Sequence, residues 1–412
     1  MVSIVPRNFP KEMWVIFAGD VITSLGMGMV FIFLSIYFNI VLGISMTILG
    51  TIWMVTDMSS FFSQLVGGAL ADHFGRKRLM ELSLFLRGMI WIMIGFIDNV
   101  PTLAIFIIVS GIVSSIFWPA SSAMVTDIIP KDRRAEAFGL WRIGGNLGWG
   151  LGAMIGGVLA AFSYKLVFMV GGISNILFGI LVIILLKETL PKKVDIEAVE
   201  NRARGMVRTI KDYRTVLYDK RFVIFVMVGV FIELLYSQAH TTMPVFVVRE
   251  SIINAKQLGY IWALNGWAIV LFQMTVTKFV EKRKISLMLA IGSMIYAVSF
   301  LLLLRATMFT EMMLFMMVFT MAEMIIAPIQ MTFVANNAPE DMRGRYMGFY
   351  SLAWGLGGST GPFIGGRIMD VYSARLLWYV IFVVGLIAML GYLIMGKLFK
   401  DGGRAPECVP DN

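Results

Sequence analysis

Charged residues are scarce in this sequence of 412 residues. Asp, Glu, Lys and Arg together make up 15% of the chain, and hydrophobic residues make up 58%. Soluble globular proteins carry about 25% charged residues, so this composition excludes an ordinary soluble protein. Since a membrane crossing needs about 20 apolar residues, the chain has room for about twelve spanning helices with short connections.

Other absences narrow the possible chemistry. The single cysteine, Cys408, excludes an internal disulfide, and two histidines, His73 and His240, cannot form a histidine-rich metal site. The sequence contains no GxxxxGK(S/T) string, so the chain lacks this phosphate-binding loop for ATP. We therefore expect no metal site and no cofactor, and we do not expect an enzyme.

Long apolar runs separated by short polar breaks predict an all-α membrane protein with twelve transmembrane helices. The predicted spans are residues 12–38, 46–71, 79–97, 102–128, 136–161, 166–186, 221–247, 257–280, 286–304, 312–335, 344–370 and 376–397.

Positive charge is distributed unequally between the two sides of these spans. Of the 35 Lys and Arg residues, 27 lie in segments on the side that holds both termini, six lie on the opposite side, and Arg87 and Arg142 lie within spans. Positive residues favour the cytoplasmic side, so we expect a multi-pass protein of the plasma membrane with both termini in the cytoplasm. Orientation and anionic lipid headgroups explain the net charge of +9, and we expect no nucleic-acid partner.

The one long polar segment divides the chain into two equal sets of six spans. We predict an N-terminal six-helix bundle over 1–186, a cytoplasmic linker over 187–220, a C-terminal six-helix bundle over 221–399 and a cytoplasmic tail over 400–412. Within the linker, apolar residues recur every three or four positions from Ile196 to Leu217. This spacing predicts an amphipathic helix along the inner leaflet, and a tether with some helical character is the alternative.

The two halves contain an internal repeat. The segment that begins at Pro130 aligns without gaps with the segment that begins at Pro339, 209 positions later. The residues that coincide are Asp132 with Asp341, Arg134 with Arg343, Gly139 with Gly348, Gly148 with Gly357, Gly152 with Gly361, Gly156 with Gly365, Gly157 with Gly366, and Pro119 with Pro328. The repeat indicates two pseudo-symmetric six-helix bundles, an arrangement typical of transporters.

A motif lies where the second predicted span meets the basic side. The string GALADHFGRKR runs from Gly68 to Arg78. It resembles the GxxxD(R/K)xGR(K/R) signature that the major facilitator superfamily carries between helices 2 and 3. The resemblance in architecture covers almost the whole chain and implies the major facilitator fold.

The resemblance implies a gate built from Gly68, Asp72, Gly75, Arg76 and Lys77. In the family, the acidic residue, here Asp72, faces the amino end of helix 11 in the other bundle and closes the cytoplasmic side. A carboxylate beside exposed helix amides is favourable by roughly 0.3–1 kcal/mol, so such a contact can form and break. The usual basic residue after the aspartate is replaced by His73.

Glycines recur along the fifth and eleventh predicted spans. The string GWGLGAMIGG resembles the GxxxGPxxGG pattern of helix 5 in the family's antiporters, with Ala153 in place of proline, and the complete pattern occurs in the eleventh span. Small residues at this spacing bring helix backbones together and also permit bending. The residues predicted to form this packing hinge are Gly148, Gly152, Gly156, Gly157, Gly361 and Pro362.

Acidic residues within the spans are the strongest functional indicators, because each costs at least about 2.5–3.5 kcal/mol at a helix centre. Glu233 lies in the seventh span and Glu323 in the tenth. The resemblance implies that helices 1, 4, 7 and 10 line a central cavity, so both glutamates are expected there. We predict that they couple transport to protons, with fixed structural contacts as the alternative, and we include Asp20 and Asp57 as further candidates.

Other polar residues within the spans have simpler expected roles. Asp20, Arg87 and Arg142 lie at similar depths, and a mutual ion pair is expected. His240, near the outer end of the seventh span, is expected to be a hydrogen-bonded interfacial histidine. The basic residue that the drug-antiporter branch usually carries in helix 4 is replaced by Ile107.

Side chains on the expected cavity helices suggest the type of substrate. Aromatic residues and methionine suit apolar or cationic organic molecules. Candidates on these helices are Phe31, Phe33, Tyr37, Phe117, Trp118, Tyr236, Met324 and Gln330, and those predicted to line the cavity are Phe33, Tyr37, Trp118, Tyr236, Met324 and Gln330.

We therefore expect a secondary transporter that exports hydrophobic or cationic organic compounds in exchange for protons. Its expected partners are a small-molecule substrate, protons and membrane lipids, and the protein is expected to be a monomer. The alternatives are a facilitator or proton symporter for one metabolite, and a membrane sensor or scaffold on a carrier fold.

Overall fold

The computed structural model describes residues 9–130, 133–190, 216–250, 252–280, 282–339 and 342–399. Within these ranges the chain is built of helices and their connections and contains no strand. The predicted amphipathic helix of the linker falls mostly on residues 191–215, which lie outside the described residues, and the predicted tail over 400–412 also lies outside them.

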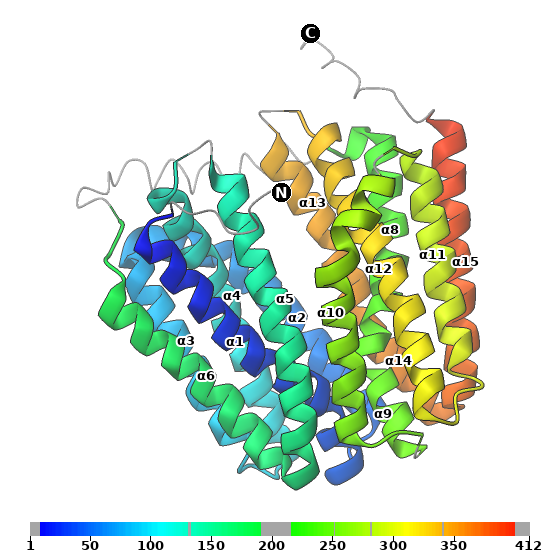
Figure 1. Cartoon of the computed structure of the whole chain (residues 1–412), viewed down its shortest axis with the longest axis horizontal. Coiled ribbons are helices and arrows are strands. Elements are labelled where there is room, and N and C mark those ends of the chain that lie inside the picture. The colour runs from blue at the N-terminus through cyan, green and yellow to red at the C-terminus, as the bar shows by residue number, and fades with distance from the viewer. Residues whose placement is uncertain are drawn as a thin grey trace.

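The first half of the chain forms one group of helices. The elements are α1 (Lys11–Ile36), the π-helical turn η1 (Tyr37–Val41), α2 (Met46–Phe74), α3 (Arg76–Ile94), α4 (Val100–Ile128), α5 (Arg134–Phe162) and α6 (Tyr164–Leu185). Within this group α1 packs on α5 and α6, α2 packs on α4, and α3 packs on α4 and α6. Figure 1 shows them side by side, in blue to green.

The second half forms the other group. Its elements are α8 (Lys220–His240), α9 (Thr242–Arg249), α10 (Ala255–Val280), α11 (Ile285–Leu302), α12 (Phe309–Asn337), α13 (Arg343–Ala353), the π-helical turn η3 (Trp354–Gly358), α14 (Ser359–Val371) and α15 (Ala374–Leu398). Here α8 packs on α14 and α15, α10 packs on α12, and α11 packs on α12 and α15. The domain limits proposed from the sequence stay predictions.

Nine of the described helical stretches are long and apolar enough to cross a membrane. The remaining long elements, α2, α3 and the path α13–η3–α14, run alongside them in the two groups. Large apolar side chains on these helices, such as Leu86, Ile184, Leu271 and Leu314, are exposed. An apolar exterior of this kind is suited to lipid, because a hydrocarbon surface needs no contact with water. This arrangement is consistent with twelve crossings.

The internal repeat reappears as matched helices. α4 and α12 each contain 29 residues, begin 209 positions apart and carry an internal proline, Pro119 and Pro328. The first residues of α5 and α13, Arg134 and Arg343, have the same separation. One difference stands out: α5 is continuous, whereas its counterpart is interrupted by the π-helical turn η3. Such interruptions are frequent at functional sites.

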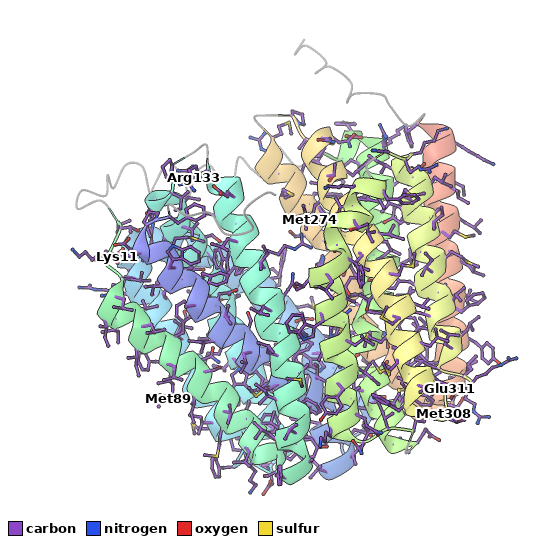
Figure 2. The ribbon with its side chains drawn as sticks, in the orientation of Figure 1. Lys11, Met89, Arg133, Met274, Met308 and Glu311 are labelled. Carbon is purple, nitrogen blue, oxygen red and sulfur yellow. The ribbon has the colours of Figure 1, made fainter. Side chains whose placement is uncertain are left out.

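The molecule has two distinct ends. Lys11 and Arg133 lie at one end and Met308 and Glu311 at the other, as Figure 2 shows. We call the end that holds the starts of α1 and α8 the basic end, and the opposite end, where α2 and α10 begin, the far end. The prediction that the basic end is cytoplasmic stays a prediction.

The two halves meet closely toward the far end. A Cβ built on Gly157 of α5 would lie 2.8 Å from the carbonyl oxygen of Ala255 on α10, and one built on Gly259 would lie 2.5 Å from that of Ala153. Toward the basic end α5 and α10 diverge, as Figure 1 shows. Glycine is required at this crossing because a side chain would push the two helices apart.

Candidate functional site

A cavity of about 760 Å³ lies between the two halves. It is lined by residues from α1, α2, α4, α5, α8, α10, α12 and the path α13–η3–α14. The resemblance implied lining by helices 1, 4, 7 and 10, and the structure adds contributions from four further paths. Its size falls within the 300–1,000 Å³ typical of sites for small organic molecules.

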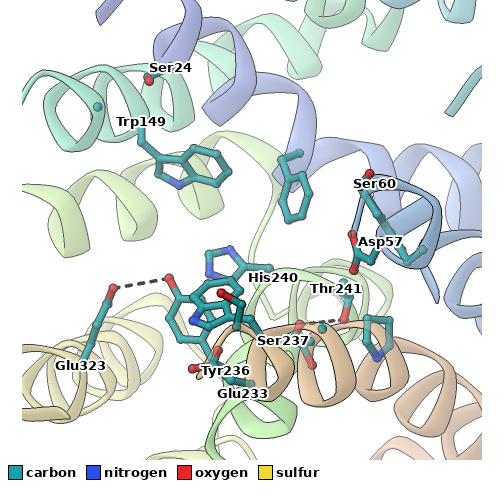
Figure 3. A pocket seen from close by; sticks show the side chains of 18 of the residues that line it. Ser24, Asp57, Ser60, Trp149, Glu233, Tyr236, Ser237, His240, Thr241 and Glu323 are labelled. Carbon is teal, nitrogen blue, oxygen red and sulfur yellow. Dashed lines mark hydrogen bonds between the residues drawn. The ribbon is translucent and has the colours of Figure 1, made fainter. Parts of the chain in front are cut away.

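Three acidic residues line this cavity: Glu233, Glu323 and Asp57. Glu323 accepts a hydrogen bond of 2.9 Å from Nδ2 of Asn265 and a longer one of 3.4 Å from the hydroxyl of Tyr236. Glu233 is only 4% exposed. Among the described residues that line the cavity there is no Lys or Arg, although Arg142 of α5 lies close enough to attract Glu323 electrostatically. The three acidic residues therefore outnumber this one nearby cation. Figure 3 shows the hydrogen bond between Tyr236 and Glu323, with Glu233 next to Tyr236.

The sequence of α8 explains how it presents several polar groups together. Tyr236 and the adjacent Ser237 lie three and four residues after Glu233, and His240 follows them by four and three. Residues spaced by three or four lie on one face of a helix. The helix ends at His240, and Pro244 follows within α9. A proline ring clashes with the carbonyl group four residues earlier, here that of His240, which accounts for the break between α8 and α9.

Aromatic rings form much of the remaining wall. Phe31 packs on Trp53 with ring centroids 4.7 Å apart, and Tyr236 packs on Trp354 of η3 at 5.8 Å. Trp149 and Trp262 also line the cavity, the first from α5 and the second from α10. Aromatic faces attract organic cations and also provide apolar surface.

Of the predicted lining residues, the structure brings only Tyr236 into this cavity. Phe33 on α1 and Tyr37 on η1 are buried, and so are Met324 and Gln330 on α12, but none of these four lines the cavity. Trp118 is exposed and packs on Trp141 at 4.7 Å. The sequence identified helices but not faces: Phe31, two positions before Phe33, points in nearly the opposite direction because each residue turns a helix by about 100°.

The other intramembrane polar residues differ from expectation. Asp20 is half-buried beside Gly145, and within the described residues no ion pair joins it to Arg87 or Arg142. Arg87 instead donates from Nε to Oδ1 of Asn175 on α6, and Arg142 is exposed. Asp20 and Arg87 therefore attract each other only without direct contact, and the expected three-residue ion pair does not form among the described residues. Instead α6 supplies Arg87 with a neutral hydrogen-bond partner that spacing along the sequence did not reveal.

His240 also differs from the expected hydrogen-bonded histidine. Its side chain is 8% exposed, and neither Nδ1 nor Nε2 has a hydrogen-bond partner among the residues that the structure describes. The ring is surrounded by other aromatic rings rather than by polar groups, with Trp262 stacked on it at 4.4 Å.

The predicted gate residues that the structure describes form contacts within the first half. Gly75 has a φ of +94°, and the carboxylate of Glu188 accepts from the backbone N–H groups of Arg76 at 3.0 Å and Lys77 at 3.1 Å. The guanidinium of Arg76 pairs with Asp127 at the end of α4. Gly68 and Asp72 belong to the last turns of α2, and beyond this backbone assignment neither position is among those that the structure describes.

The predicted hinge residues divide into two groups. Gly148, Gly152 and Gly156 pack α5 on α1, and Gly361 packs α14 on α8, so these contacts lie within one half. Gly157 faces α10, and the carbonyl of Pro362 is approached by Gly50 of α2, so these contacts join the halves. These close approaches are what the structure gives, and the role of these residues as a packing hinge stays a prediction.

Several lining residues were not anticipated from the sequence. They include Asn265 on α10, the only asparagine in that helix, and Trp149, which lies between Gly148 and Gly150. An isolated amide in the middle of an apolar span is a usable signal, because a polar group within a membrane needs a partner or water. Trp149 offered no such signal among the ten tryptophans of the chain.

Comparison with known proteins agrees with this architecture. The family model described as Major Facilitator Superfamily matches residues 16–362 and residues 241–408. The chain belongs to the Major Facilitator Superfamily. This confirms the resemblance drawn from the gate motif, and it confirms the all-α membrane fold in two related halves. Members of the superfamily are transporters, so the chain is a multi-pass membrane transporter of small molecules and not an enzyme.

Individual members of the superfamily are similar to this chain along nearly its full length. A Na(+), Li(+), K(+)/H(+) antiporter of Planococcus maritimus is 27% identical, covering 86% of this chain and 89% of its own. The multidrug resistance protein MdtH of Salmonella newport (strain SL254) is 25% identical, covering 93% of each chain. Among solved structures, a bacterial homologue of the human lysosomal transporter Spinster has a TM-score of 0.79 at 14% identity, covering 97% of this chain and 100% of its own.

Proposed function

We propose that this transporter exports hydrophobic or cationic organic compounds across the cell membrane in exchange for protons. The single observation that carries the proposal is the pairing of Glu233 and Glu323 in one aromatic cavity between the halves. Two relatives support it in part, since one is named as an antiporter that exchanges alkali cations for protons and another as a multidrug resistance protein.

The volume of the cavity favours an organic molecule over a bare metal cation. About 760 Å³ is far more than the space of one water molecule, roughly 30 Å³, and an alkali cation with its oxygen ligands would leave most of it unfilled. The aromatic rings of Phe31, Trp149 and Trp262 would contribute little to a hard cation, which prefers oxygen atoms. These rings would contribute both apolar area and cation–π attraction to an organic cation.

The two glutamates provide the coupling. A carboxylate without a paired cation is costly inside the membrane, so each glutamate is stabilised when it binds either a proton or a cationic substrate. Glu233 has no hydrogen-bond donor among the described residues, whereas Glu323 has Asn265 and Tyr236. In this scheme proton binding displaces the substrate, and the neutral, empty carrier returns.

The conformation of the structure fits one state of an alternating-access cycle. With the basic end in the cytoplasm, contact at the far end and divergence at the basic end correspond to an inward-facing state. The Spinster homologue of similar fold was solved in a conformation described as inward-facing and unoccupied. Substrate would therefore enter this cavity from the cytoplasm.

Proton release in inside-out vesicles tests the proposal. Adding tetraphenylphosphonium to vesicles that hold the parent protein and a proton gradient is expected to release protons, and Glu233→Gln and Glu323→Gln should each reduce this release at least tenfold. Glu311→Gln is a matched control, because Glu311 lies half-buried at the far end, outside the cavity lining, and its hydrogen bonds among the described residues are to the start of its own helix.

Four results would contradict the proposal or its coupling step. Uptake of a single metabolite without proton movement would favour a facilitator, and proton entry together with a metabolite would favour a symporter. Purified protein in liposomes that moves neither organic cations nor metabolites would favour a sensor or scaffold. Unchanged proton release in both glutamate variants would remove the coupling role of these residues.

A further inference from the structure

His240 occupies an unusual position at the centre of an aromatic box. Its imidazole is stacked on Trp262 with centroids 4.4 Å apart and an interplanar angle of 26°. Tyr236 lies at 4.8 Å, and Phe31 and Trp149 each lie at 6.1 Å. The box therefore joins α8 and α10 of the second half to α1 and α5 of the first. Figure 3 shows the His240 ring between Trp149 and Tyr236.

The two ring nitrogens are the only strongly polar atoms in this box apart from the Tyr236 hydroxyl and the indole N–H groups. A neutral imidazole offers one hydrogen-bond donor and one acceptor. Within the described part of the chain neither nitrogen of His240 has a hydrogen-bond partner, although the side chain is more than nine-tenths buried and lines the cavity. Leaving such groups unpaired opposes folding, and phenylalanine would fill the same space without that cost.

The surroundings of His240 suggest what its partner would be. Stacking on Trp262 and the nearby faces of Tyr236 and Trp149 favour a flat aromatic molecule. The three carboxylates of the cavity, Asp57, Glu233 and Glu323, favour a positive charge on it. Its edge would have to carry a nitrogen or amino group to complete the hydrogen bonds of the imidazole.

We propose that His240 selects substrates by hydrogen bonding and stacking, and that the preferred class is planar aromatic cations with N–H groups or ring nitrogens at their edge. This inference rests on the proposed function and extends it, because it separates one group of organic cations from another. His240 is thus a specificity-determining residue, distinct from the two glutamates that respond to charge.

Two cations that differ in hydrogen-bonding groups test the inference. Ethidium is planar and carries amino groups, whereas tetraphenylphosphonium has neither property. Equilibrium binding to purified full-length protein is measured for both with the parent, His240→Phe and His240→Gln. Phenylalanine keeps an aromatic ring and removes both nitrogens, whereas glutamine keeps one donor and one acceptor. Melting temperatures of all three proteins show whether each variant is folded.

The expected result is a loss of ethidium affinity of about tenfold in His240→Phe, with tetraphenylphosphonium affinity within twofold of the parent. The preference is the ratio of the affinity for ethidium to the affinity for tetraphenylphosphonium. His240→Gln is expected to recover at least half of the loss in the logarithm of this ratio. Equal weakening of both cations by His240→Phe would overturn the inference and leave the proposed function standing, as would unchanged affinity for both. If neither cation binds the parent, both the proposed function and this inference are wrong.

Discussion

Asp370 at the end of α14 binds the first turn of α2 through Thr47, although the two residues lie 323 positions apart. Its carboxylate accepts from the backbone N–H of Thr47 at 2.7 Å and from the Thr47 hydroxyl at 2.6 Å, and it also accepts from the backbone N–H of Met46 at 3.2 Å. An acidic side chain is favourable at a helix N-terminus, where N–H groups lack helical partners. This contact joins the two halves at the far end.

Asp370→Ala is expected to destabilise the closed far end. A capping interaction contributes about 1 kcal/mol, so its loss should raise the proportion of molecules open at this end by roughly fivefold. Spin labels on Lys165→Cys and Arg249→Cys, in a Cys408→Ser background, would report the separation of the halves by pulsed electron resonance. These two exposed residues lie at the far end of α6 and α9.

Glu311→Ala provides the control for Asp370→Ala. Glu311 is also a far-end carboxylate, half-buried, but it accepts from Thr307 and Met308 at the start of its own helix. Its loss should therefore leave the distance distribution unchanged. A similar shift in both variants, or in neither, would show that the contact between Asp370 and Thr47 does not hold the halves together.

Asn265→Ala is expected to weaken cation binding by about tenfold. Asn265 donates 2.9 Å hydrogen bonds to Thr320 and to Glu323, so it holds this carboxylate in place from α10. Hydrogen bonds to charged groups contribute about 1.5–3 kcal/mol, and 1.4 kcal/mol corresponds to a tenfold change in affinity. Equilibrium binding of tetraphenylphosphonium to the purified protein measures the effect.

Gln273→Ala is the matched control for Asn265→Ala. Gln273 also links α10 to α12, through a 3.0 Å hydrogen bond to the carbonyl of Met324, but it does not line the cavity. The affinity of the Gln273→Ala protein for tetraphenylphosphonium should stay within twofold of that of the parent. Equal weakening in the two variants would mean that the packing of α10 on α12, rather than the position of Glu323, controls binding.

Gly75→Ala should lower thermal stability more than Gly43→Ala. Both glycines have positive φ, +94° and +68°, so alanine is strained at either position by about 1–2 kcal/mol. A Cβ at Gly75 would in addition lie 2.5 Å from Oε2 of Glu188, whereas no atom of the described residues lies within 4 Å of one at Gly43. Thermal unfolding in detergent measures both variants, and an equal fall in melting temperature would contradict the crowding at Gly75.

Asn175→Leu is expected to destabilise the packing of α3 on α6. Arg87 donates to Asn175, and its side chain is 8% exposed, so removing the amide leaves a buried guanidinium without this partner. Loss of a hydrogen bond to a charged group costs about 1.5–3 kcal/mol. The double variant Arg87→Met with Asn175→Leu should regain part of the lost melting temperature, because it removes the buried charge as well. Additive losses would show that the two residues are not coupled.

The sequence by itself determined the solvent, the helices and the duplication. A shortage of charge left lipid as the only suitable surroundings, and apolar runs of about 20 residues located the spans, because a helix satisfies its own backbone within hydrocarbon. The 209-residue repeat predicted paired helices, and α4 and α12 keep that separation. The position of Glu233 and Glu323 within apolar spans also marked them as functional candidates, because a charged group within the membrane is costly. Both residues line the cavity.

Tertiary structure alone decided which face of each helix meets which neighbour. Composition does not fix rotation about a helix axis when the whole helix is apolar, so Phe31 rather than Phe33 faces the cavity, and Asn175 rather than Asp20 binds Arg87. The contact between Asp370 and Thr47 and the aromatic box around His240 join residues from different halves of the chain. Such contacts depend on how the two halves meet, and no local pattern in the sequence encodes that arrangement.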